Sequence, residues 1–480
     1  MTPRFLATVA IVAGVSMTAA HAAPATDLTI YRSDSDSLFA AADRGSLASG
    51  YALVHETRQL DLKSGRQVIS LDGLPEQLDA EALDLRFPGR KDIRSLASRL
   101  LLPDQSSVLA THVGQPVTVI GDNGQTLAAG TLLGERNGLL VRDAQGVSLV
   151  RNYAAVRLGQ EDVRGGVRLA ASIESGKAGQ TTAKLDYPTG GMGWRAAYTG
   201  TLVDSGAGCH LNLASDASIA NRSGRDWDAA TLKLVAGEPR FARSSGPQPR
   251  MMAMAAQAAP APESHPQQAA MGDYRSYTID GAIDLPDGSI TRVPLYAPRN
   301  IDCQRSWLFE HGSAWLPARP QLARGFDRGG EDRISSHLKF TAFDNLPAGY
   351  LRVNGIFNGQ HELLGEARLA DTPRGQPVDV TLGTAFDLRG KRERSAFSLD
   401  RAARTLDESF RITLSNGGDS DRSVTVREHP DRWRSWTLVS SSVQPARKTA
   451  DTLDFTISVP ARGQAVLDYS LRYQWTANDE

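Results

Sequence analysis

Apolar and polar side chains alternate over long stretches of the C-terminal part of the chain. Every second side chain is apolar in residues 453–459, in 467–475 and in 410–414. A period of two indicates strands that bury one face. Turn-forming residues at 416–418 (Asn-Gly-Gly) and at 460–463 separate these stretches. Short alternating strands between turns are typical of an antiparallel β-sandwich.

A pattern of still shorter strands fills residues 113–160. Asn-Gly pairs at 123–124 and 137–138 interrupt it, and Asn-Gly between apolar alternations is a strong hairpin signal because both residues tolerate a positive φ. Such a meander predicts a small β-barrel. The expected strands of this unit are Pro116–Ile120, Leu127–Leu133, Leu139–Arg142 and Ser148–Val150.

Helical periodicity is scarce along the whole chain. The stretch from Ile93 to Leu102 is predicted to be one of the few helices, and Pro103 would end it. Very little helix is therefore expected.

Residues 244–272 change character abruptly. Ser, Gly, Pro, Gln and Ala dominate, and four of the seven methionines lie between Met251 and Met271. This composition cannot bury a core, so we expect a disordered linker whose two flanking segments belong to one sheet. A flexible loop with incidental methionines is preferred here over a soft-metal site built from thioethers.

Together these patterns predict an all-β chain of tandem antiparallel β-sandwich domains with a small inserted β-barrel. An N-terminal strand domain is expected at 27–92 and the barrel at 113–160. A central sandwich is expected at 165–330, interrupted by the linker at 244–272, and a C-terminal sandwich at 335–475.

The first residues indicate export from a bacterial cell. Arg4 precedes a short apolar run at residues 6–15, and the small-x-small sequence Ala20-His21-Ala22 follows. This layout predicts a signal peptide over residues 1–22, cleaved after Ala22, whose apolar run is too short to span a membrane. We expect a periplasmic or secreted protein with no transmembrane segment after processing.

Composition adds two constraints. A net charge of −1 over 480 residues gives no electrostatic footprint for nucleic acid. The chain has two cysteines, Cys209 and Cys303. In an oxidising compartment these predict one disulfide, with two free buried thiols as the alternative.

Motifs that would mark catalysis each lack a required partner. His361-Glu362 begins a zinc-protease phrase, but Gly365 stands where the second helical histidine is needed. Ser336 and Lys339 match a Ser-x-x-Lys pair, yet the apolar residues around them indicate a strand or loop. The glycines at 190–193 precede an alternating strand, whereas a dinucleotide loop opens a helix.

Two short acidic clusters, residues 34–36 and 419–421, are expected to be solvated turns, with loop-bound calcium as the alternative. Paired carboxylates of a glycosidase cannot be recognised along a sequence, since their spacing is spatial. We therefore assign no catalytic, metal-binding or cofactor-binding residue, and we expect no cofactor.

Several phrases resemble a known family in order and spacing. The chain reads YPTGGMGW at 187–194, NRSG at 221–224 and LKLVAG at 232–237, and it closes on RYQW at 472–475. These phrases resemble the domain-of-unknown-function family 4139, which includes mucoidy-inhibitor-A-like envelope proteins. Some of its members carry a long coiled coil where this chain has the expected barrel. The resemblance implies a fold and a compartment, and it supplies no catalytic residues.

These observations favour an exported, non-enzymatic envelope protein that binds a protein or glycan partner, because sandwich loops and strand edges suit binding. The alternative is a hydrolase that acts on an envelope polymer through an acidic site between domains. A Ser-His-Asp arrangement or clustered acids in a cleft would favour that alternative.

Overall fold

The computed structural model describes residues 25–40, 50–101, 108–110, 112–159, 167–205, 208–237, 239, 267–314, 316–326 and 330–479. The predicted signal peptide, with its cleavage site after Ala22, and residues 244–266 of the predicted linker lie outside this part of the chain. Within it, no helix is long and apolar enough to cross a membrane.

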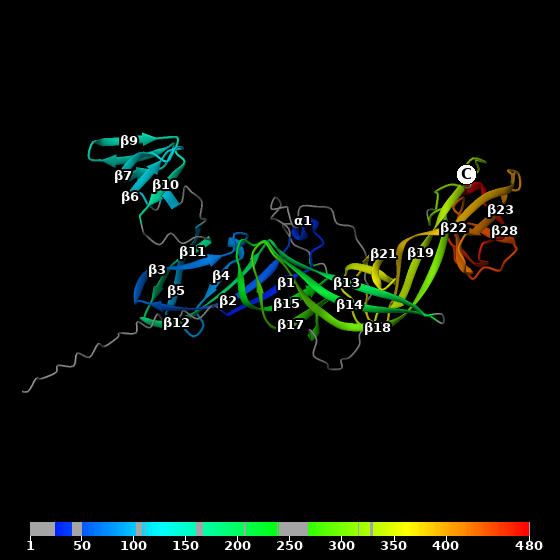
Figure 1. The fold of residues 1–480 in the computed structure, drawn as a ribbon, viewed down its shortest axis with the longest axis horizontal. Helices are drawn as coiled ribbons and strands as arrows, with labels where there is room; N and C mark the ends of the chain where they lie inside the picture. The colour runs from blue at the N-terminus through cyan, green and yellow to red at the C-terminus, as the bar shows by residue number, and fades with distance from the viewer. Residues whose placement is uncertain are drawn as a thin grey trace, which may run out of the picture.

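Strands dominate the described residues, which confirms the all-β prediction. The described helical segments are short: α1 (Asp36–Phe39), η1 (Ala80–Ala82), η2 (Ala477–Asp479) and the helical residues 108–110. Figure 1 shows an elongated molecule in which the N-terminal strands and the C-terminus lie at opposite ends.

The N-terminal strands share a sheet with strands from the middle of the chain. β1 (Ala25–Tyr31) runs parallel to β15 (Trp227–Ala236). β2 (Ala52–Leu62) lies between β1 and β12 (Gly179–Thr189). Residues 27–92 therefore do not form a domain of their own, which differs from the division expected from the sequence. In spatial order the seven strands are β16 (Gln267–Met271), β17 (Tyr274–Leu285), β15 (Trp227–Ala236), β1 (Ala25–Tyr31), β2 (Ala52–Leu62), β12 (Gly179–Thr189) and β4 (Asp84–Arg86).

The two segments that flank the linker lie side by side in this sheet, as expected. β15 pairs with β17 in an antiparallel ladder that begins with Trp227 opposite Leu285. The linker was predicted too long, however, because Gln267–Met271 form β16 and pair with β17. Backbone groups alone make a ladder, so small and polar residues can extend a sheet edge without contributing to a core.

A three-stranded sheet covers the N-terminal end, and it corrects the helix prediction. Ile93–Leu101 form strand β5, which pairs with β11 from Ile93 opposite Ser175 onward. β5 is an edge strand with most of its side chains exposed, so pairing with β11 overrides its local sequence preference. The other two strands are β3 (Gly65–Leu74) and β11 (Val167–Ser175).

The largest sheet has thirteen strands and runs from the centre of the molecule to its C-terminal end. Its main path, in spatial order, is β21 (Gln360–Leu369), β20 (Gly349–Phe357), β13 (Met192–Ser205), β14 (Gly208–Asn221), β18 (Ile290–His311), β19 (Gly330–Thr341), β22 (Pro377–Asp400), β23 (Thr405–Asn416), β28 (Gly463–Gln474) and β25 (Trp436–Ser441). Beside this path lie β24 (Arg422–Glu428), β26 (Arg447–Lys448) and β27 (Leu453–Val459).

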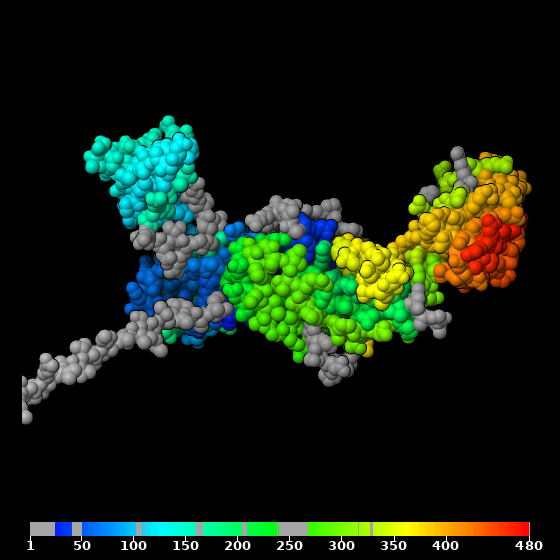
Figure 2. Space-filling view, viewed as in Figure 1, coloured from blue at the N-terminus to red at the C-terminus, as the bar shows by residue number. Residues whose placement is uncertain are grey.

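Two large apolar cores lie along this sheet, and three long strands pass through both. β19 buries Leu338 in the first core and Ile334 in the second, and β22 likewise buries Leu382 and Leu388. β18 continues to Phe309 in the second core. The structure thus does not divide at residues 330–335 as the sequence suggested. The second core lies on a continuation of the same sheet. Figure 2 shows the C-terminal residues, in orange and red, at one end of the molecule next to the yellow and green central residues.

Residues 113–160 fold as an open sheet, so the barrel prediction was wrong. The order is β10-β6-β7-β8-β9, and no ladder joins the two edge strands β9 and β10. A closed barrel needs its first and last strands to pair, whereas here each edge strand is hydrogen-bonded on one side only. The module has a small core of its own and projects from the N-terminal end (Figure 1). Its strands are β6 (Pro116–Ile120), β7 (Thr126–Gly134), β8 (Leu139–Asp143), β9 (Gly146–Val150) and β10 (Ala155–Leu158).

Cys209 and Cys303 form the expected disulfide. They lie directly opposite each other on β14 and β18, with their Cα atoms 5.0 Å apart. The bridge therefore cross-links β14 and β18, two neighbouring strands of the largest sheet, and the chain between them includes β15, the linker region, β16 and β17.

Candidate functional site

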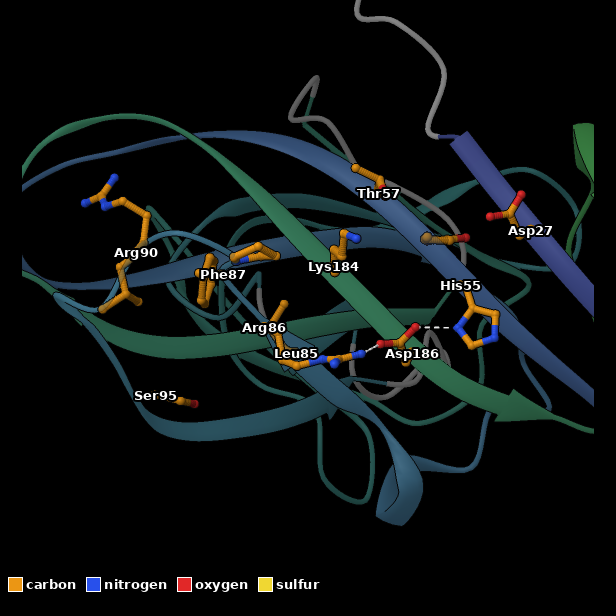
Figure 3. A pocket seen from close by; sticks show the side chains of 13 residues that line it. Asp27, His55, Thr57, Leu85, Arg86, Phe87, Arg90, Ser95, Lys184 and Asp186 are labelled. Carbon is orange, nitrogen blue, oxygen red and sulfur yellow. Dashed lines mark hydrogen bonds and ion pairs between the residues drawn. The ribbon is translucent and has the colours of Figure 1, made fainter.

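A groove of about 760 Å³ opens between the seven-stranded and three-stranded sheets. Side chains from β1, β2, β4, β5 and β12 line it (Figure 3). Most of its walls are strands rather than loops, so the ladders hold the lining side chains in fixed positions.

Asp186 on β12 is the centre of a charged cluster in this groove. Its Oδ1 lies 2.5 Å from Nδ1 of His55, directly opposite on β2, and its Oδ2 contacts the Arg86 guanidinium on β4. The Nε of Arg86 also lies 2.9 Å from the Asp84 carboxylate. The three strands bring these groups together because β12 lies between β2 and β4, and opposite residues on neighbouring strands are side-chain neighbours.

Two charges of opposite sign lie in the groove without a partner. Among the described residues, neither the Lys184 ammonium nor the Asp27 carboxylate makes an ion pair. Lys184 is two residues before Asp186 on β12, so it points to the same face of the sheet, and Asp27 projects from β1 on the other side of His55 (Figure 3). Within the described part of the chain, the groove therefore presents one cation and one anion that make no ion pair.

A buried network behind the groove fixes the strand that carries His55. The next residue, Glu56, is buried, and it accepts hydrogen bonds from Arg58 at 2.7 Å and from the Tyr187 hydroxyl at 3.1 Å. Arg225 contacts the same carboxylate. Burial, followed by the charge of Glu56, raises the pKa of Tyr187 well above its ordinary value, so this phenol stays a hydrogen-bond donor.

The rim of the groove carries an exposed ion pair. Arg90 donates to both oxygens of Asp92 at 2.8 and 2.9 Å, and to the Ser175 hydroxyl at 3.0 Å. The hydrogen bond from Arg90 lowers the pKa of Asp92 to about 2. This bidentate pair ties the loop after β4 to the end of β11.

We predict that the Asp92 carboxyl titrates near pH 2 and that Arg90→Gln moves this titration up toward the ordinary aspartate value. Because the folded pKa lies below the unfolded value of roughly 4, the pair stabilises the fold fully above pH 4 and loses its contribution as pH falls through about 2. NMR titration of the side-chain carboxyl measures this directly. An Asp92 that titrates near pH 4 in the unmodified protein would contradict the pairing.

A second polar cluster lies on β19 and β22, far from the groove in sequence. Ser335 Oγ is 2.9 Å from Nε2 of His337, and Nδ1 of His337 is 2.9 Å from Oδ1 of Asp379. Lys339 Nζ lies 3.4 Å from the other oxygen of Asp379. The cluster forms because residues 335, 337 and 339 alternate onto one face of β19 and Asp379 lies on the neighbouring strand.

The three sequence motifs that resemble catalytic phrases lie on strands or in a turn. His361 and Glu362 lie on strand β21, and Ser336 and Lys339 lie on β19 with an odd spacing that puts them on opposite faces. Gly191 has a φ of +71°, and a Cβ there would approach the Arg222 carbonyl oxygen to 2.5 Å. The glycine phrase is therefore a tight turn between β12 and β13.

The acidic clusters are held by neighbouring basic or backbone groups. Asp34 pairs with Arg32 at 2.9 Å and Asp419 accepts from Arg462 at 2.7 Å. Asp421 accepts from the backbone N–H of Ala461. These contacts agree with the interpretation of both clusters as turns.

The sequence did not single out the groove residues or the Ser335 cluster. His55 and Asp186 are 131 residues apart, so no local spacing connects them. For Ser335 and His337 a weak signal existed, namely a serine and a histidine two residues apart in a predicted strand, but their partner Asp379 is 42 residues from His337.

One protein-family model, described as a domain of unknown function (DUF4139), matches residues 183–477. No curated protein and no solved structure matches the chain. The matched region includes β12 with Lys184 and Asp186, and most of the largest sheet.

Proposed function

The chain belongs to the DUF4139 family, and on that premise we propose that it is an exported bacterial envelope protein that binds a protein or glycan partner through the groove around Asp186. One observation carries this proposal: Lys184 and Asp27 form no ion pair with any residue that the structure describes, and they lie beside the paired His55–Asp186–Arg86 cluster. Fixed charges of both signs in an open groove suit a polar ligand that carries both signs.

The groove chemistry supports binding over acid–base hydrolysis. A hydrolase with paired carboxylates needs one of them protonated and poised at the scissile bond. Here both carboxylate oxygens of Asp186 are already engaged, one by Nδ1 of His55 and the other by the Arg86 guanidinium. Of the other two carboxylates that line the groove, Glu56 is buried in its own hydrogen-bond network and Asp27 lies exposed on β1. An extended polymer segment with amino and carboxylate groups is the ligand class that these charges complement.

We predict that the exported protein co-sediments with envelope polymer and that Lys184→Glu weakens this binding at least about tenfold, because it reverses the one unpaired cation of the described groove. The probe is purified peptidoglycan sacculi, with envelope polysaccharide as a second arm. Raising the salt concentration should weaken binding in the same direction, because the contacts are exposed charges.

Lys63→Glu is the matched control, because Lys63 is exposed between β2 and β3 and does not line the groove. The two variants have the same charge change, so a general charge effect lowers binding equally in both. Equal binding by the Lys184 variant and the unmodified protein would refute the groove as the binding site.

A further inference from the structure

Ser335, His337 and Asp379 are connected in the order nucleophile, base and orienting carboxylate. The two hydrogen-bonding distances, Ser335 Oγ to His337 Nε2 and His337 Nδ1 to Asp379 Oδ1, are both 2.9 Å. Each ring nitrogen thus has the partner that acyl-transfer chemistry requires. We propose that this cluster, called here the β19 site, is a second functional site that hydrolyses acyl esters.

The β19 site faces away from the first core. Ser335 lies opposite Leu308 in the ladder, whereas its neighbour Ser336 lies opposite Trp307 and lines a separate pocket on the other face of the sheet. The His337 side chain is 15% exposed and that of Asp379 is 50% exposed. The imidazole is therefore largely protected while the site as a whole reaches solvent.

The ladder holds the catalytic residues without a loop. Ser335 and His337 are two residues apart on β19, so their side chains leave the same face, and β22 supplies Asp379 beside them. Lys339 contacts the Asp379 oxygen that His337 does not use. This contact fixes the carboxylate so that its other oxygen stays aligned with Nδ1.

The reaction follows from these contacts. Ser335 Oγ attacks the ester carbonyl carbon while its proton passes to Nε2 of His337, and the resulting imidazolium is stabilised by Asp379. His337 then gives that proton to the leaving alkoxide, the C–O bond breaks, and an acyl-serine remains. Water attacks the acyl carbon, its proton passes through His337 to Ser335 Oγ, and a carboxylic acid leaves. The Ser335 hydroxyl has a single proton, which in the resting state can instead be donated to the Leu308 carbonyl oxygen at 3.1 Å; for the attack it must point to Nε2 of His337.

The surroundings favour a small acyl group on a polar carrier. The same face bears Lys339, half exposed, together with Glu310 and Arg427, which lie opposite each other on β18 and β24. Such polar side chains do not form an acyl-chain pocket, so a long fatty acyl group would lack apolar contacts. A short ester such as an O-acetyl group on a sugar polymer can reach an open sheet face.

The test is labelling of the full-length exported protein with a fluorophosphonate probe, followed by mass spectrometry to locate the adduct. We expect the adduct on Ser335, and we expect His337→Gln to slow labelling by about 100-fold or more, which is the usual contribution of a general base. Ser336→Ala is the matched control, since this serine is adjacent in sequence but faces the other side of the sheet. Its labelling rate should equal that of the unmodified protein.

Turnover of 4-nitrophenyl acetate supplies the second readout. Asp379 is a positioning residue, so Asp379→Asn should lower kcat with little change in KM, and the variant should unfold at the same temperature as the parent. No adduct, an adduct on another residue, or equal labelling of the His337→Gln variant would overturn the proposal. None of these outcomes depends on ligand binding in the groove.

Discussion

Glu408→Ala should destabilise the C-terminal core by about 3–5 kcal/mol, because the substitution removes the carboxylate that pairs with the buried Arg432 guanidinium. Glu408 and Arg432 are each 1% exposed, and Arg432 donates to both carboxylate oxygens at 2.6 and 2.8 Å. Arg394 donates to the same carboxylate at 3.2 Å. Arg432 would keep only its bonds to the backbone carbonyls of Gln321 and Ala323.

The neighbouring residue provides the control. Asp407 also accepts two hydrogen bonds from an arginine, Arg472, at 2.7 and 3.1 Å, but this pair is on the solvent face, with both side chains at least 40% exposed. Asp407→Ala should therefore cost less than about 1 kcal/mol. Denaturant unfolding followed by tryptophan fluorescence measures both variants, since Trp433 is buried in this core. Equal losses of unfolding free energy in Glu408→Ala and Asp407→Ala would contradict the distinction between a buried and an exposed ion pair.

Removing the Cys209–Cys303 disulfide should lower the free energy of unfolding by up to about 4–5 kcal/mol, the entropic value for a loop of this size. The two cysteines are 94 residues apart in sequence, and the loop between them includes the predicted linker. Without the bridge, the unfolded chain gains the freedom of that long loop, while β14 and β18 remain paired in the fold by their ladder.

The measurement compares denaturant midpoints of the oxidised protein, the reduced protein and a Cys209→Ser/Cys303→Ser variant. The variant should unfold like the reduced protein, and reductant should not change it further. Thiol titration of the denatured, unreduced protein should find no free thiol. Two free thiols, or a midpoint that reduction does not move, would refute the stabilising bridge.

Local alternation predicted most individual strands correctly. Residues 453–459 form β27, and 467–474 lie in β28. The four short strands expected between 116 and 150 are β6 to β9. A period of two is a property of neighbouring residues, so it can be observed without knowing which strand lies alongside.

Features that depend on distant pairing were not predictable in this way. Ile93–Leu101 form a strand because β11 pairs with them. β1 pairs with β15, whose residues lie 204 positions later in the chain, as in Asp27 opposite Thr231. Closure of the small sheet and the division between cores are likewise set by strand partners. These partners are chosen by the whole fold, and the pattern within one segment does not encode them.

The candidate sites likewise depend on which distant strands pair. The disulfide was predictable because the chain has only two cysteines. The groove required β2, β4 and β12 to be placed side by side, and the β19 site required Asp379 of β22 beside His337. Lys184 and Asp186 have an ordinary strand spacing, so nothing in the sequence distinguished them from other exposed charges.

Photo-crosslinking from inside the groove in intact bacterial cells tests the binding proposal most directly. A photoreactive phenylalanine analogue at Thr57, which lines the groove, should form an adduct with one reproducible envelope partner, and Lys184→Glu should remove that adduct. The same analogue at Thr437, an exposed threonine on β25, should not form it, because β25 pairs with β28 at the other end of the molecule (Figure 1). No adduct from Thr57, or the same adducts from both positions, would contradict binding through the groove.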